Sequence, residues 1–144
     1  MFNIKKLIRS KNMYENGIWY AQIENLDGGA VEVGIQGNER GAEPQSVELA
    51  ERVLSGFSKY KKEGIGLITS FIPNIPEDGL RLFSIDVVPF TVGTHGVQEI
   101  CTGDCFMVSW DCSKYTETCW IFTVKFVLDS QGEIYNRSVE IWML

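Results

Sequence analysis

The sequence IWYAQIENLDGGAVEVGIQ, residues 18–36, predicts a β-hairpin. Apolar and polar side chains alternate on both sides of Asp27-Gly28-Gly29, as in strands with one buried face. The two glycines supply the positive φ angles that a tight reversal needs. One face of the first strand carries Trp19, Ala21 and Ile23, and one face of the second carries Val31, Val33 and Ile35.

Two helices are predicted to follow the hairpin. From Pro44 onward, apolar residues recur at spacings of three and four and form a single stripe. Its members are Val47, Ala50, Val53, Leu54, Phe57 and Tyr60. Pro44 suits a first helical turn, and Gly64 is the predicted C-cap. A shorter helix is predicted over residues 65–72, ending before Pro73.

The second half of the chain predicts strands over residues 80–90, 105–111, 118–128 and 133–143, with an irregular stretch at 93–103. In the third of these, alternation gives a core face of Trp120, Phe122, Val124, Phe126 and Leu128. Short turns between consecutive strands imply antiparallel pairing. We therefore predict one α+β domain over residues 1–144: an N-terminal hairpin, a central helix pair and a mainly antiparallel sheet in two layers.

Charge limits the classes of partner. The 144 residues carry a net charge of −6, and the first eleven carry +4 from Lys5, Lys6, Arg9 and Lys11. The remainder therefore carries −6 − 4 = −10. Nucleic-acid affinity depends on Lys and Arg displacing counterions from phosphates, so no nucleic-acid partner is expected. A basic protein partner fits this charge better.

The N-terminal sequence and the hydropathy indicate a cytoplasmic protein. Charged residues interrupt the apolar ones near the N-terminus, so no signal-peptide h-region is present there. No apolar run approaches the ~18 residues of a membrane span, and no membrane association is expected.

The four cysteines are Cys101, Cys105, Cys112 and Cys119, and reduced thiols are expected in a cytoplasmic protein. Zinc sites usually contain two closely spaced cysteine pairs, and only Cys101 and Cys105 have such a spacing. These two would be the ligands of any metal site. The Gly-rich phosphate loops are absent from the sequence, and no cofactor is predicted.

An enzyme is one reading of the sequence. His95 is the only histidine and would act as the base for a nucleophilic thiol, with Cys112, Cys101 or Cys105 as nucleophile. Asp111 or Asp86 would orient the imidazole. This set describes a small Cys/His-dependent, hydrolase-like enzyme.

A protein-binding surface is another reading. Trp142 falls among the polar residues of the last strand, with Asn136, Ser138 and Glu140. Tryptophan anchors many protein interfaces, so Trp142 and Glu140 are candidate contact residues. Glu32 and Glu48 are candidate acidic contacts for a basic partner. A homo-oligomer is also compatible with the sequence.

The hairpin residues Ile18-Trp19 and Val31-Glu32-Val33-Gly34-Ile35, with Pro44-Gln45 and the helix to Tyr60, resemble small bacterial domains of unknown function. Some of those domains are suspected immunity proteins of toxin systems. The resemblance covers the first half of the chain and implies a protein that neutralises a toxin by binding. The leading prediction is therefore a non-enzymatic interaction domain, an immunity or accessory protein. The alternatives are the Cys/His enzyme and a small-ligand-binding domain with a pocket between helix and sheet.

Overall fold

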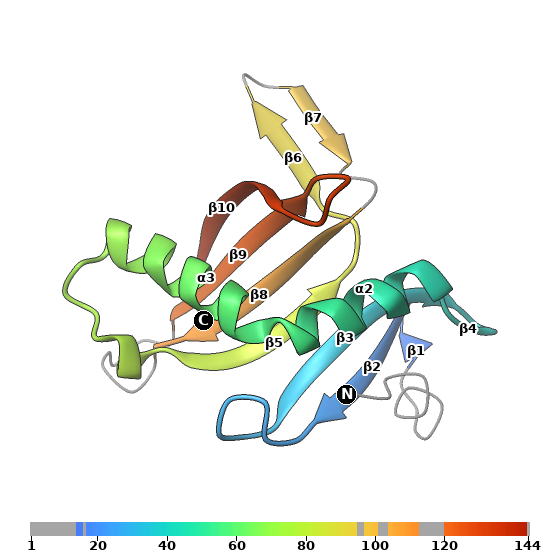
Figure 1. Ribbon diagram of the computed structural model, residues 1–144, viewed down its shortest axis with the longest axis horizontal. Helices are drawn as coiled ribbons and strands as arrows, with labels where there is room; N and C mark the ends of the chain where they lie inside the picture. Colours follow the sequence, from blue (N-terminus) through green and yellow to red (C-terminus); the bar gives the residue numbers. More distant parts are fainter. Residues whose placement is uncertain (1–13, 16, 95–96, 101–103, 113–119, 144) are drawn as a thin grey trace.

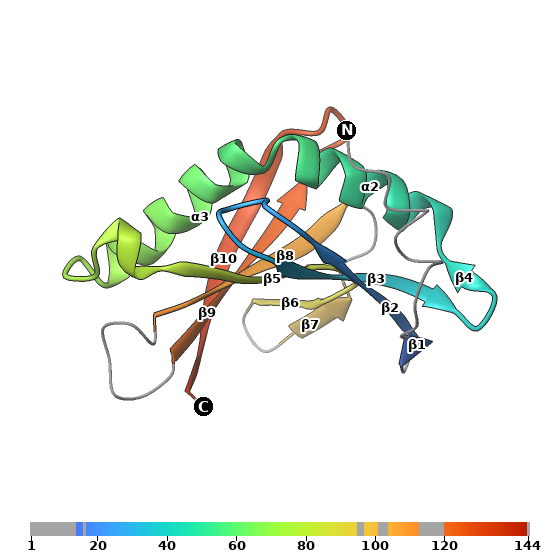
Figure 2. The same ribbon diagram turned by 90° about the horizontal axis from the view of Figure 1, so that it is seen from below.

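The computed structural model describes residues 14–15, 17–94, 97–100, 104–112 and 120–143. It confirms the α+β class: helices α2 (Pro44–Ser55) and α3 (Phe57–Phe71) lie along one face of a β-sheet (Figures 1 and 2). The strands are β1 (Tyr14–Glu15), β2 (Ile18–Ile23), β3 (Val31–Asn38), β4 (Gly41–Ala42), β5 (Arg81–Val87), β6 (Thr91–Thr94), β7 (Val97–Ile100), β8 (Cys105–Asp111), β9 (Trp120–Leu128) and β10 (Ile134–Met143). A 3-10 turn, η1, spans Glu77–Gly79.

The main sheet has the order β1-β2-β3-β5-β8-β9-β10, and β4 pairs with β3 beside this path. The predicted hairpin over residues 18–36 is confirmed, with Trp19 opposite Ile35 and Gly28 at φ 83° in its turn. The described pairs are antiparallel except β3 with β5, which is parallel. The helix pair forms the crossover between these two strands, because parallel neighbours need a long connection.

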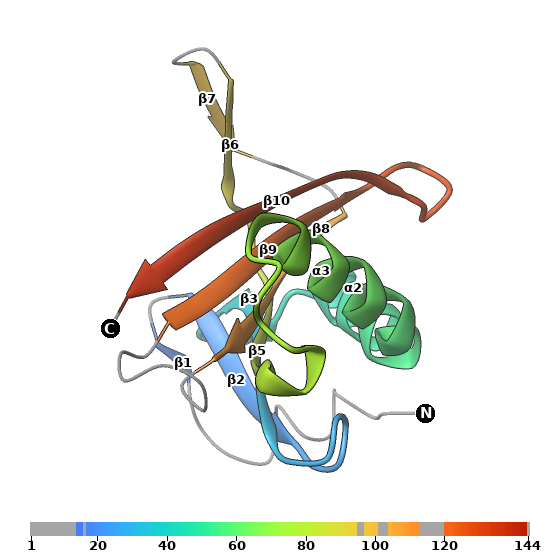
Figure 3. The same cartoon turned by 90° about the vertical axis from the view of Figure 1, so that its left-hand side faces the viewer.

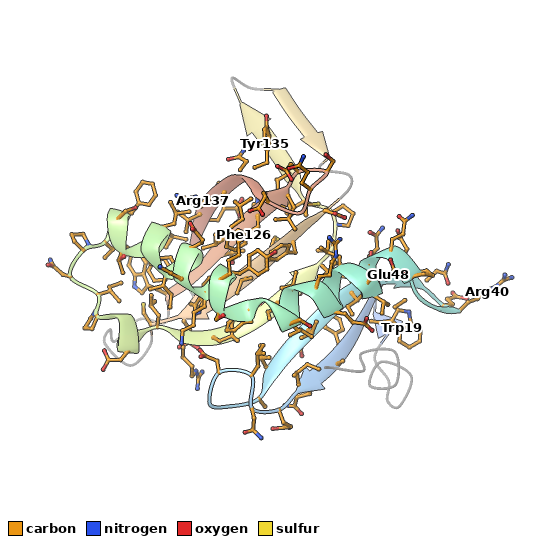
Figure 4. The ribbon with its side chains drawn as sticks, viewed as in Figure 1. Trp19, Arg40, Glu48, Phe126, Tyr135 and Arg137 are labelled. Carbon is orange, nitrogen blue, oxygen red and sulfur yellow. The ribbon has the colours of Figure 1, made fainter. Side chains whose placement is uncertain are left out.

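The core lies between the helices and the sheet. Tyr60 on α3 meets Phe106 of β8 edge-on, with ring centroids 4.9 Å apart, and Phe106 stacks on Phe126 at 5.1 Å. The predicted core face of β9 is confirmed for Phe122, Val124, Phe126 and Leu128, and Trp120 is half-buried against the same cluster. Figure 4 shows Phe126 beneath the helices. The helices pack against this face of the sheet, which we call the helix face.

The prediction of Gly64 as a helix C-cap is wrong. The first helix ends at Ser55 with Gly56 as its cap, and Gly64 lies inside α3. A Cβ at residue 64 would lie 2.7 Å from Cζ3 of Trp110 and closer still to Cη2. Glycine at this position therefore lets α3 approach the indole ring on β8.

Alanine at two glycines of α3 should have opposite effects on stability. Gly66 has open space around its Cα, so Gly66→Ala should raise the free energy of unfolding by about 0.5–1 kcal/mol through helix propensity. Gly64→Ala should lower it by about 1–3 kcal/mol, because Trp110 must shift. Urea denaturation of the two variants measures the difference. Equal stabilisation by both would contradict the close contact with Trp110.

The second half of the chain differs from the prediction in two further places. The strand predicted to end at Phe90 ends at Val87. Part of the stretch predicted to be irregular pairs as a hairpin, with Thr91 opposite Ile100 and Thr94 opposite Val97. Glycines at 93 and 96 interrupt the apolar pattern there and hide the strands from a sequence reading. Figure 3 shows the β6–β7 hairpin projecting away from the main sheet.

Candidate functional site

The residues of the predicted Cys/His enzyme are not brought together within the described part of the chain. Cys112 packs in the core on the helix face, with its thiol 3.8 Å from the carbonyl oxygen of Trp120. Asp111 points to the other face, where its buried carboxylate accepts hydrogen bonds from Arg81 at 2.8 and 3.1 Å. Successive side chains of a strand point to opposite faces, so Asp111 and Cys112 cannot act on one substrate group. His95 lies outside the described residues.

The predicted metal ligands receive no support from the described residues. Cys105 is buried at the start of β8, and Cys101 lies outside the described residues. Among the residues that the structure describes, no group of three or more His, Cys, Asp or Glu side chains is placed to hold a metal ion.

Three of the four predicted binding residues share the sheet face opposite the helices, which we call the second face. The β9–β10 register pairs Trp142 with Ile121 and Glu140 with Thr123, both on this face. Glu32 also lies on it, opposite Ser84 of β5. Glu48 does not: it is exposed on α2, on the other side of the molecule from this face (Figure 4).

Among the described elements, strand β10 carries the largest number of exposed large apolar side chains. Tyr135 is 77% exposed, Trp142 56% and Ile141 45%. β10 ends the sheet, and on its outer side no described strand pairs with it. A register shift between Ile134 and Asn136 leaves Tyr135 as a bulged residue, which turns its ring outward (Figure 4).

The polar neighbours of β10 are held in place by ion pairs. Glu140 bonds Lys125 of β9 across the second face, and Lys125 also lies 5.5 Å above the ring of Phe90. On the helix face, Arg137 bonds Glu63 of α3 at 3.2 Å. The charges next to the exposed apolar residues are therefore already paired within the chain.

Asp86 is the most perturbed acid of the described structure. Its carboxylate lies over Gly34 of β3, where a Cβ would be 2.6 Å from Oδ1, and Ile18 and Tyr20 flank the same spot. Burial, with a smaller contribution from the nearby charge of Glu32, raises the pKa of Asp86 to about 6, and a hydrogen bond from Ser84 acts in the opposite direction. At neutral pH the second face thus holds two neighbouring carboxylates, Asp86 and Glu32, and no ion pair to either is found in the described structure.

A cavity lies where the parallel strands end and α2 begins. It has a volume of about 320 Å³ and lies between helix and sheet, as the small-ligand alternative requires. Its walls include Gln36 from the end of β3, Ser46 and Leu49 from α2, Val87 from β5 and Cys105 from β8. Ligand crevices in α/β sheets often lie outside the carboxyl ends of parallel strands.

The sequence matches no protein-family model, and neither the curated proteins nor the solved structures include a match. No helix in the described part of the chain is both long enough and apolar enough to cross a membrane.

Two features of the structure were not found by sequence reasoning. From the sequence, Asp86 is predicted only as a residue that would orient the imidazole, and its position inside the apolar strand predicted over residues 80–90 is the available signal for a buried carboxylate. The exposure of Tyr135 was not predicted, because alternation placed it with Val139 and Ile141 and gave no sign of the bulge. The position of Trp142 on the polar face was predicted and is confirmed.

Proposed function

We propose that this protein is a non-enzymatic interaction domain that binds a protein partner along the outer edge of β10. The observation that carries the proposal is the position of the exposed large apolar side chains. Of the five in the described structure, three (Tyr135, Ile141 and Trp142) belong to this one strand. Among the described strands, none pairs with its outer edge.

Edge strands offer peptide N–H and C=O groups to other chains, and proteins usually protect them with short length, charge or a covering segment. β10 has ten residues, and its two charged side chains at 137 and 140 are bound to other strands or helices. Aromatic side chains beside such an edge are typical anchors of an interface. Strand addition with aromatic anchors is a common mode of peptide recognition.

The charge of the chain supports a basic partner. With −6 overall, the chain attracts cationic proteins at long range, and Glu32 and Asp86 add unpaired acids to the second face. An immunity or accessory protein that neutralises a basic toxin by binding is the specific form that the resemblance suggests.

The test is a binding comparison between matched surface variants. Partners captured from cells by the intact protein are purified, and their affinities are measured for Trp142→Ala and for Phe71→Ala. The second variant removes another exposed aromatic ring, at the end of α3. We expect Trp142→Ala to weaken binding about ten-fold or more and Phe71→Ala to leave it unchanged. Cys112→Ala and His95→Ala should also bind normally. Equal affinities of the Trp142 and Phe71 variants for every captured partner would refute the β10 site.

An activity that His95→Ala abolishes without unfolding the protein would instead support the hydrolase alternative. Ligand binding in the cavity beside α2 is the second candidate function, favoured by the size and position of that cavity. We rank it below protein binding because Asp104, an acidic residue that lines the cavity, already forms an ion pair with Arg52 at 3.0 Å. The other side chains that line the cavity include both polar and aliphatic groups, and neither kind forms a cluster.

A further inference from the structure

The main sheet has two parts, which meet where β3 pairs with β5 (Figure 1). Among the described strands of this sheet, β1 to β4 lie on one side of the junction, and β5, β8, β9 and β10 lie on the other. Four residue pairs form the junction, beginning with Glu32 and Ser84 and ending with Ile35 and Val87. We call these four pairs the β3–β5 seam. Separation of the seam would detach the β2–β3 hairpin from the rest of the sheet.

Asp86 lies in this seam, opposite Gly34 of β3. Its Oδ1 atom occupies the space that a side chain at residue 34 would fill, and Ile18 and Tyr20 of β2 border the same space. The carboxyl group therefore packs against the hairpin, and the glycine leaves room for it. If β3 moved away from β5, these neighbours would move with it, and the carboxyl group would enter water.

The groups of the hairpin that face Asp86 favour its neutral form. Ile18 and Tyr20 surround it with aliphatic and aromatic carbon, which limits the access of water. Glu32 of β3 carries a like charge, which opposes ionisation of Asp86. On the same strand as Asp86, Ser84 donates a hydrogen bond at 3.1 Å, which favours the charged form and only partly offsets the burial.

The strands on the other side of Asp86 provide no counter-ion within the described structure. Its partner on β8 is Met107, which is uncharged. The next residue in the same row is Lys125 of β9, whose ammonium group bonds Glu140. In these surroundings the pKa of Asp86 is raised from 3.8 to about 6, chiefly by burial.

We propose that the ionisation of Asp86 controls how often the β2–β3 hairpin separates from β5. The inference does not depend on the β10 binding site. Because the carboxyl group in the closed seam holds its proton more tightly than one in water, a rise in pH favours the open seam. Opening therefore becomes more frequent as the pH rises from 3.8 to about 6, and it changes little above that range. The fully buried side chains of Val33, Ile35 and Ile85 oppose opening at every pH, so the open form stays the minor one.

The test is backbone hydrogen exchange of the full chain at pH 4 and pH 7.5, for the intact protein and for Asp86→Asn. If the hairpin separates as a unit, the paired amides of β2 and β3 exchange as one group, more readily than those of β8 and β9. Protection factors, corrected for the intrinsic rate at each pH, give the opening equilibrium of this group. We expect it to rise by up to about fifty-fold from pH 4 to pH 7.5, and Asp86→Asn should remove most of this rise.

Glu24→Gln is the matched control, because Glu24 is an exposed acid that follows β2 and lies outside the seam. This variant should keep the rise, and continued protection of β8 and β9 would confirm that each variant folds. An equal rise in Asp86→Asn and in the intact protein would overturn the proposal. Exchange of the hairpin amides in one step with those of β8 and β9 would also overturn it, as would equal opening of the intact protein at both pH values.

Discussion

Phe57→Ala should lower the free energy of unfolding by about 3–5 kcal/mol, because it removes a ring from the core and leaves a cavity. Phe57 begins α3 and is 5% exposed, directly after the Gly56 break between the two helices. Urea or thermal denaturation followed by circular dichroism measures the loss.

The matched control is Lys62→Ala on the same helix. Lys62 is exposed, and its substitution should change stability by no more than about 0.5 kcal/mol. If the two variants denatured at the same midpoint, α3 could not present Phe57 to the core.

Asp86→Asn should stabilise the protein at pH 7.5 and have almost no effect at pH 4. The folded-state pKa of Asp86 is about 6, above its ordinary value of 3.8, so the fold favours the protonated acid. Above pH 6 the folded protein must carry a buried carboxylate that is ionised, which costs at most about 3 kcal/mol. This cost disappears as the pH falls from about 6 to 3.8, and asparagine avoids it at every pH.

We therefore expect a gain of about 1–3 kcal/mol at pH 7.5, measured by urea denaturation at both pH values. Glu32→Gln is the control: Glu32 is exposed on the same face, and its substitution should change stability by less than about 1 kcal/mol. A loss of stability for Asp86→Asn at pH 7.5 would mean that the ionised carboxylate is favourably bound in the native protein. Functional sites often contain acids of this kind, whose burial raises the pKa and destabilises the fold at neutral pH.

Local patterns were sufficient to predict the elements that bury one face. The turn at Asp27-Gly28-Gly29, the stripe from Val47 to Tyr60 and the alternation from Phe122 to Leu128 all depend on neighbours close in sequence. Gly64 shows the limit of such patterns. A side chain at residue 64 would collide with Trp110, which belongs to another element far along the chain. The sequence around Gly64 contains no sign of this contact and suggests only a helix cap.

The candidate site shows the same limit. Alternation assigned Trp142 and Glu140 to the polar side of their strand, and the structure confirms this. Nothing in the sequence indicated that this strand would form an edge, because strand order is decided by pairings between distant segments. The parallel pairing of β3 with β5 was missed for the same reason. Glu32 and Glu48 were equivalent candidates for acidic contacts with a basic partner. The structure places Glu32 on the second face and Glu48 on α2, on the other side of the molecule.

The parallel pairing of β3 with β5 has a consequence for how the chain folds. Strands β5, β8, β9 and β10 are neighbours joined in chain order, and their antiparallel contacts close comparatively short loops. The β2–β3 hairpin joins these strands only when β3 pairs with β5, for example Glu32 with Ser84. Both helices lie between these two strands in the sequence. Closing that loop costs more conformational entropy, and such non-local pairings slow folding. The seam between β3 and β5 should thus form late, and opening it would release the hairpin as a unit while the remaining sheet stays paired.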